Sequence, residues 1–184
     1  MIILNQSTQR DAGEVILLRG RTEEDIYSCV KRVRQDSPAT LYRGVVGFDP
    51  KASSETIAKT ICNDQELYRK ETGIRIRMKN VIMSPSDLNK GKEFEEACRI
   101  LDGFAVYYAN EGFPTVYNLW KNKEGDYIGT IVFGSVSPAD GHKYHYNKES
   151  VREREQEALD TVAYNVTGKN RPKALFDFRK QIYY

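Results

Sequence analysis

A stretch of alternating apolar and basic residues follows Gly73 and limits the folds that the chain can adopt. From Ile74 to Lys79 the apolar side chains take the even positions and the basic side chains take the odd ones. The basic residues are Arg75, Arg77 and Lys79. Because residues two apart in a strand lie on the same face, the pattern predicts a sheet with one packed face and one solvated face.

Other segments predict the rest of the fold. Strands are expected at 14–18, 41–46, 115–120 and 127–136, and helices at 22–34, from 53 through 61 and on towards 69, at 91–110 and at 147–166. The turn residues 122–125 separate two strands, which are therefore predicted to form a hairpin. The order of elements predicts an α+β fold with an antiparallel-rich sheet and helices mainly on one face.

The helix at 91–110 carries the clearest core pattern. Its apolar residues recur at i, i+3, i+4 and i+7, which is typical of a helix with one buried face. The residues predicted to be buried are Phe94, Ala97, Cys98, Leu101, Phe104, Ala105 and Tyr108.

Length and composition suit one soluble domain. The chain has 184 residues, and we expect a single domain over 1–168 followed by a basic and aromatic segment over 169–184. Three widely spaced cysteines form no CxxC pair, which favours reduced thiols in a cytoplasmic protein. No apolar run reaches the length of a membrane span, so no membrane partner is expected.

Three segments in sequence order carry a family resemblance. The first is 48–73, which begins Phe-Asp-Pro and ends Glu-Thr-Gly, and the second is Val-Ile-Met-Ser-Pro at 81–85 before the long helix. The third is Phe-Gly-Ser-Val-Ser at 133–137, followed by Asp-Gly-His-Lys-Tyr-His-Tyr-Asn-Lys at 140–148. Together these segments resemble the plasmid mobilisation relaxases of the HUH endonuclease superfamily, over roughly 40 to 165.

The resemblance implies an HUH-type fold and a DNA-nicking chemistry. In that family a tyrosine attacks a phosphodiester and stays linked to the 5′ phosphate, while three histidines hold a divalent metal that stabilises the developing charge. The position of the nucleophile corresponds to Tyr42. The metal-binding H-x-H pair would fall at Ile128 and Thr130, and the whole chain has only two histidines. The chain therefore resembles a degenerate relaxase without the metal-binding histidines.

Tyr42 has two interpretations. It is either the nucleophile or one of twelve tyrosines that pack a sheet. Without a metal or a base, a tyrosine is a poor nucleophile toward a phosphodiester. We therefore expect no cofactor, and Mg²⁺ or Mn²⁺ on acidic or asparagine ligands if nicking activity is present.

DNA binding needs cations and stacking aromatic rings but no metal. The candidate DNA-binding residues are Arg75, Arg77, Lys79, Trp120, His142, Lys143, Tyr144 and Lys148. The alternative for the basic strand is an ordinary solvated face or a sheet edge protected by charge. For His142, which with His145 forms an HxxH pair, the alternative is a role in a surface turn.

Three functions follow as hypotheses. The first is a relaxase-like protein of a mobile genetic element that binds single-stranded or hairpin DNA without metal-dependent nicking. The second is an active nicking enzyme with an atypical metal site. The third is an accessory subunit that binds other relaxosome proteins.

Overall fold

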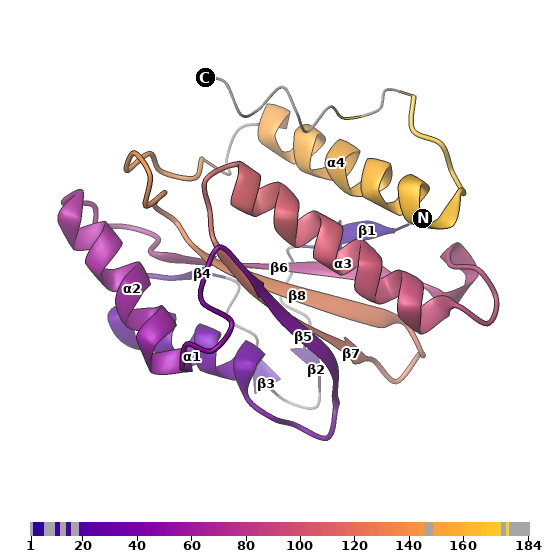
Figure 1. Ribbon diagram of the computed structural model, residues 1–184, viewed down its shortest axis with the longest axis horizontal. Helices are drawn as coiled ribbons and strands as arrows, with labels where there is room; N and C mark the ends of the chain where they lie inside the picture. The colour runs from indigo at the N-terminus through magenta and orange to yellow at the C-terminus, as the bar shows by residue number, and fades with distance from the viewer. Residues whose placement is uncertain are drawn as a thin grey trace.

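The computed structural model describes residues 2–5, 10–11, 14–15, 19–145, 149–173 and 176. The described elements include both strands and helices, as expected for an α+β fold (Figure 1). They are β1 Ile3–Asn5, β2 Arg10–Asp11, β3 Glu14–Val15, β4 Arg19–Gly20, α1 Glu23–Arg34, β5 Thr40–Val46, α2 Ser54–Leu67, β6 Ile76–Met83, the 3₁₀ turn η1 Pro85–Asp87, α3 Glu93–Asn110, β7 Thr115–Lys121, β8 Tyr127–Gly134 and α4 Glu149–Thr167.

The sheet is antiparallel and has the strand order β1-β6-β8-β7-β5, with β4 also paired to β6. β7 and β8 form the predicted hairpin, in which Asn118 lies opposite Thr130. On its other side β8 pairs with β6, where Asn80 lies opposite Thr130. Side chains directly opposite each other share a face, so this register aligns rows of residues across the sheet.

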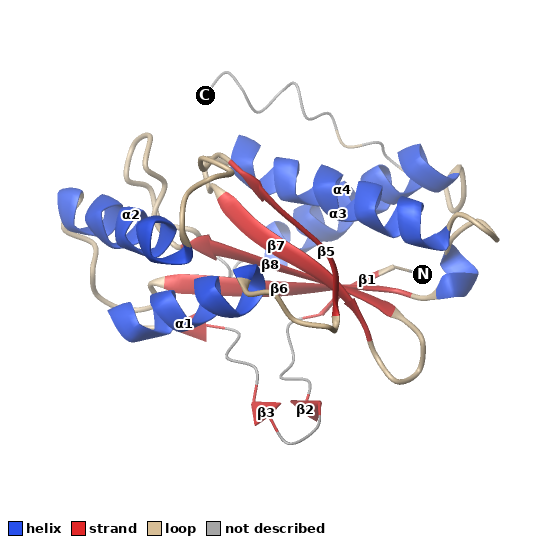
Figure 2. Cartoon of the chain, turned by 60° about the horizontal axis from the view of Figure 1, so that its bottom comes forward, coloured by secondary structure: helices blue, strands red, loops and turns tan. Residues whose placement is uncertain are grey.

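Helices cover both faces of the sheet (Figures 1 and 2). Ile131 packs with the core formed by α3 and α4, while its neighbour Val132 packs with the core formed by α1 and α2. The prediction of helices mainly on one face is therefore wrong. Every residue of β8 is buried, and a strand buried on both faces reads as a continuous apolar run rather than an alternating one.

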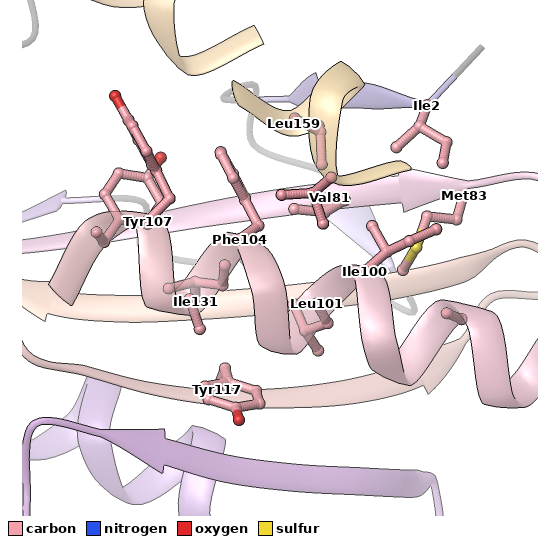
Figure 3. Packing of buried hydrophobic residues seen from close by; sticks show 14 of the residues in the cluster. Ile2, Val81, Met83, Ile100, Leu101, Phe104, Tyr107, Tyr117, Ile131 and Leu159 are labelled. Carbon is pink, nitrogen blue, oxygen red and sulfur yellow. The ribbon is translucent and has the colours of Figure 1, made fainter. Parts of the chain in front are cut away.

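The larger core lies between the sheet and α3 and α4, and Figure 3 shows part of it. Leu101 and Phe104 are completely buried there, as the helical spacing predicts. Phe94 is 46% exposed, so its predicted burial is wrong. Helical spacing identifies which side chains share a stripe, but it does not say whether a partner lies opposite the first turn of the helix.

Local signals set the helix starts. Thr22 and Asp25 form a reciprocal capping box at the start of α1, in which each side chain accepts a hydrogen bond from the other's backbone N–H. Ser53 caps α2, which continues without a break to Leu67. Both caps confirm the starts that the sequence predicts.

The described part of the C-terminal segment returns over α3 and α4. The Phe176 backbone N–H donates to Thr161 Oγ1, and the Phe176 ring packs edge-on against Tyr107 with centroids 5.5 Å apart. Lys169 Nζ donates to the backbone carbonyl oxygen of Leu88. Among the described residues, no helix is both long enough and apolar enough to cross a membrane.

Candidate nucleic-acid interface

Several of the predicted DNA-binding residues meet around the ring of Tyr144. Tyr144 belongs to the loop between β8 and α4, while Arg77 and Lys79 come from β6. The Arg77 guanidinium carbon lies 5.6 Å from the centre of the Tyr144 ring, and Lys79 Nζ lies 5.1 Å from it. Both cations are thus close enough to the Tyr144 ring for a cation–π attraction.

Lys79 is buried beneath this ring and pairs with Glu155 of α4. Lys79 Nζ lies 3.1 Å from Glu155 Oε2. Tyr108 donates a 2.8 Å hydrogen bond to Glu155 Oε1, and the Tyr144 hydroxyl donates to the same oxygen. Lys79 is only 2% exposed, so the prediction that it belongs to an open cationic row is wrong. A buried carboxylate supplies the counter-charge that such a lysine requires.

Burial and neighbouring cations shift the protonation equilibria of this cluster. Burial is the largest cause that lowers the pKa of Lys79, to about 8, and the Glu155 carboxylate opposes this shift. Arg77 and Arg152 lower the Lys79 pKa further, because both place positive charge near Nζ. Burial and the same carboxylate raise the pKa of the Tyr144 hydroxyl, which therefore stays a hydrogen-bond donor.

Arg75 lies apart from this cluster. Its Nε donates a 2.7 Å hydrogen bond to Gln65 Oε1 of α2, and its Nη1 lies 3.7 Å from Glu23 Oε1 of α1. It is 6% exposed, and its Nη2 is buried without a hydrogen-bond partner. Arg75 precedes β6, so strand alternation does not apply to it, and the predicted open row of three basic residues is not formed.

The loop residues His142 and Lys143 are more accessible. The exposed His142 has its Nδ1 2.6 Å from Asp140 Oδ1. Hydrogen bonds from the His142 backbone N–H and side chain lower the pKa of Asp140 to about 2. Lys143 Nζ donates to the Thr72 carbonyl oxygen at 2.9 Å. Lys148, the last predicted member, lies outside the described residues.

Trp120 lies on the opposite face of the sheet from Tyr144. Its indole Nε1 donates to Thr130 Oγ1 at 3.3 Å, and Thr130 Oγ1 donates to Asn80 Oδ1 at 3.0 Å. Thr130 precedes Val132 by two positions and shares its face, the one that α1 and α2 cover in part. The predicted aromatic residues therefore divide between two faces.

Tyr42, the candidate nucleophile, is held by a carboxylate. Its hydroxyl donates to both oxygens of Asp102 at 3.0 Å, and Tyr117 donates to Asp102 Oδ1 at 2.8 Å. Burial is the largest cause that raises the pKa of Tyr42, followed by the hydrogen bond and the charge of Asp102. The raised pKa keeps the Tyr42 hydroxyl protonated, so nucleophilic attack would require a base to take its proton.

The two positions that correspond to the metal-binding pair do not lie beside Tyr42. Tyr42 packs against the core under α3 and α4, whereas Thr130 and Ile128 point to the other face. Ile128 is completely buried and apolar, and the Thr130 hydroxyl is already hydrogen-bonded. In the part of the chain that the structure describes, no three His, Cys, Asp or Glu side chains group as metal ligands. Ile128 and Thr130 are therefore not suitable ligands for a divalent metal of the kind that relaxases bind.

Three residues that matter to these sites were missed in the sequence. Glu155 precedes the apolar residues Ala158, Leu159 and Val162 by three, four and seven positions, so helical spacing already places it on their buried face. Asp102 carries no such signal, since its tyrosine partners come from two strands. Asn118 becomes notable only when its neighbours across the sheet are known.

Comparisons of the chain with protein-family models, with curated proteins and with solved structures gave no match. The likeness to relaxases therefore remains a prediction from the sequence. Function has to be argued from the contacts and charges of the described residues.

Proposed function

We propose that this protein binds single-stranded or hairpin DNA through the cationic surface around Tyr144, as a relaxase-like protein of a mobile genetic element without metal-dependent nicking activity. The observation that carries the proposal is the convergence of cations from separate elements. Arg77 and Lys79 of β6 lie against the Tyr144 ring, and Arg152 of α4 is close enough to Lys79 to lower its pKa.

Charge balance supports a polyanionic ligand at this surface. The buried Glu155 carboxylate offsets the positive charge of Lys79. Two tyrosine hydroxyls also donate hydrogen bonds to this carboxylate. Arg152 is exposed and Arg77 is half-buried, so their charges act on the solvent side of the cluster. Lys143, in the same loop as Tyr144, adds a further cation, although its Nζ donates to the Thr72 carbonyl oxygen. Clustered cations of this kind attract phosphate groups and release counterions on binding.

The surroundings of Tyr42 argue against the nicking alternative. Its hydroxyl faces the Asp102 carboxylate, which would repel both a tyrosinate and an incoming phosphate. A nuclease of this class needs a positive centre near the attacked phosphate. The cations around Tyr144 favour a binding role.

A mobility-shift experiment tests the proposal. Labelled single-stranded, hairpin and duplex DNA of equal length would be titrated with the protein between about 50 and 200 mM salt. We expect complexes with single-stranded or hairpin DNA that weaken steeply as salt rises. The exposed Lys59 of α2 offers a matched control, because Lys59→Gln removes a cation away from Tyr144 and should leave binding unchanged. Absence of salt-sensitive binding to all three DNA forms would refute the proposal.

A further inference from the structure

A row of polar side chains crosses the sheet on the face opposite the α3 and α4 core. Asn80 of β6 lies opposite Thr130 of β8, Thr130 lies opposite Asn118 of β7, and Asn118 lies opposite Arg43 of β5. The apolar cluster under α1 and α2 takes Val116 and Val132 from the same strands, two residues before this row in β7 and two residues after it in β8. The row thus begins where that apolar packing ends.

Two hydrogen bonds fix Trp120 beside the row. The indole Nε1 donates to Thr130 Oγ1, and the Thr130 hydroxyl donates a hydrogen bond to Asn80 Oδ1. Thr130 and Asn80 are 6% and 2% exposed, so this chain is shielded from water. Trp120 itself is only half-buried. These hydrogen bonds hold the indole ring in one orientation before any ligand binds.

Asn118 is a member of the row whose side-chain oxygen has no hydrogen-bond partner among the described residues. It is 9% exposed, and its Oδ1 is buried without any hydrogen bond. Buried polar side-chain atoms are nearly always hydrogen-bonded, so such an atom calls for an explanation. The explanation must also account for its position two residues before Trp120, on the same face of β7.

We propose that Trp120 and Asn118 form a binding site for an adenine ring. An asparagine amide pairs with the N6 amino group and the N7 nitrogen of adenine, since it offers one acceptor and one donor side by side. A half-buried indole provides the stacking surface that a base requires. Asn80, Thr130 and Asn118 are neutral, which suits an uncharged ring better than a metal ion or a buried phosphate.

Arg43 ends the polar row on β5, at the edge of the sheet. Its side chain is 46% exposed, and its Nη1 lies 2.7 Å from Asp36 Oδ1. Its Nη1 also donates to the Arg34 carbonyl oxygen, so a phosphate on the adenine would compete with these partners for Arg43. That adenine can belong to a free nucleotide or to a nucleic acid strand, and both share the recognition described here. The proposal is independent of the Tyr144 surface, which lies on the other face.

The single tryptophan of the chain makes a direct experiment feasible. Trp120 fluorescence of the full-length protein would be followed during titration with AMP and, separately, with IMP, which carries an oxygen in place of the N6 amino group. We expect saturable quenching by AMP and affinity for IMP that is lower by about tenfold or more. Oligo(dA) and oligo(dT) distinguish the two sources: quenching by oligo(dA) without quenching by AMP would assign the site to a strand.

Variants separate recognition from general effects on the fold. Asn118→Leu keeps the size of the side chain and removes the amide, so it should abolish the preference for AMP over IMP. Asn110→Leu, at the exposed C-terminal end of α3, should bind AMP as the unaltered protein does. Equal quenching by AMP and IMP would overturn the proposal. Absence of saturable quenching by both AMP and oligo(dA) would also overturn it and would leave an ordered water as the partner of Asn118.

Discussion

Lys79 and Glu155 form a buried ion pair across 76 residues of sequence, with Nζ and Oε2 3.1 Å apart. The pair joins β6 to α4. Tyr108 and Tyr144 donate to the second carboxylate oxygen, so the buried charge is hydrogen-bonded on both sides. The same pair lies directly beneath the proposed DNA-binding surface, which means that stability and binding depend on neighbouring atoms.

Removal of the lysine should be costly. Lys79→Met leaves the Glu155 carboxylate buried without its cation, and we expect the free energy of unfolding to fall by about 3–5 kcal/mol. Urea unfolding followed by circular dichroism measures this change. Lys59→Met, on an exposed face of α2, is the matched control and should change stability by less than about 0.5 kcal/mol. Equal stability of Lys79→Met and the unaltered protein would show that the pair contributes nothing.

The lowered pKa of Lys79 predicts an unusual dependence of stability on pH. Its pKa is about 8 in the folded protein and 10.5 without the fold, so above pH 8 the unfolded chain holds more protons on this group. The stability of the unaltered protein should therefore rise between pH 8 and 9 relative to that of Lys79→Met, by at most about 1.4 kcal/mol per pH unit.

Other groups oppose this trend. Burial raises the pKa of Cys29 and Cys98 from 9.0 to about 11 and also raises that of Cys62, so from about pH 8 upward the folded state holds more protons on these thiols, which offsets the rise from Lys79. Urea unfolding at half-unit steps from pH 7.5 to 9 measures the rise. Lys79→Met should lack the rise, and the same slope in both proteins would contradict the assignment.

Two changes at Tyr144 separate its hydroxyl from its ring. Tyr144→Phe removes the hydrogen bond to Glu155 but keeps the ring beside Arg77 and Lys79. We expect it to cost about 1.5–3 kcal/mol of stability, as for a hydrogen bond to a charged group, while DNA affinity is retained. Tyr144→Leu should weaken DNA binding as well. Equal DNA affinities of the two variants would exclude a role for the ring.

Tyr42→Phe tests whether nicking activity exists. Since the Tyr42 hydroxyl faces Asp102, we expect neither the unaltered protein nor the variant to cleave supercoiled or single-stranded DNA with Mg²⁺ or Mn²⁺. Agarose and denaturing gels provide the measurement. Metal-dependent cleavage that disappears in Tyr42→Phe would establish the active relaxase instead.

Asn118→Leu should stabilise the ligand-free protein. The buried Oδ1 has no hydrogen-bond partner, and an apolar side chain of similar size removes that unsatisfied group. We expect the free energy of unfolding to rise by about 1 kcal/mol. A thermal melt without nucleotide provides the measurement. A loss of stability would indicate that a hydrogen bond to Asn118, such as one from an ordered water, is present after all.

Local patterns in the sequence predicted most of the elements. The helix start at 22 and the hairpin at 115–136 depend on residues within a few positions of each other, and both predictions are confirmed. The prediction for the basic strand was wrong because the burial of Lys79 depends on a residue far away in the sequence. Its alternation places Arg77 and Lys79 on one face, but only the distant Glu155 makes that face a place for a buried lysine.

The candidate sites depended still more on contacts between distant segments. The sequence singled out Tyr144 by its loop motif, yet the role proposed for it depends on the cations of β6 beside its ring. Asn118 drew attention only once the register aligned it with Thr130. The burial of apolar side chains can be predicted from their spacing along the sequence. The burial of a polar side chain cannot be predicted in this way until its partner is known.

The salt dependence of DNA binding tests the central proposal most directly. Fluorescence anisotropy with a labelled single strand gives the slope of log affinity against log salt for the unaltered protein and for a variant that combines Arg77→Gln, Lys143→Gln and Arg152→Gln. If these cations contact phosphates, the magnitude of the slope should fall by about 2, since each phosphate contact on a single strand contributes about 0.7. Lys59→Gln should keep the original slope. An unchanged slope in the triple variant, with its fold intact by circular dichroism, would contradict the assignment of the DNA-binding surface to Tyr144 and its cations.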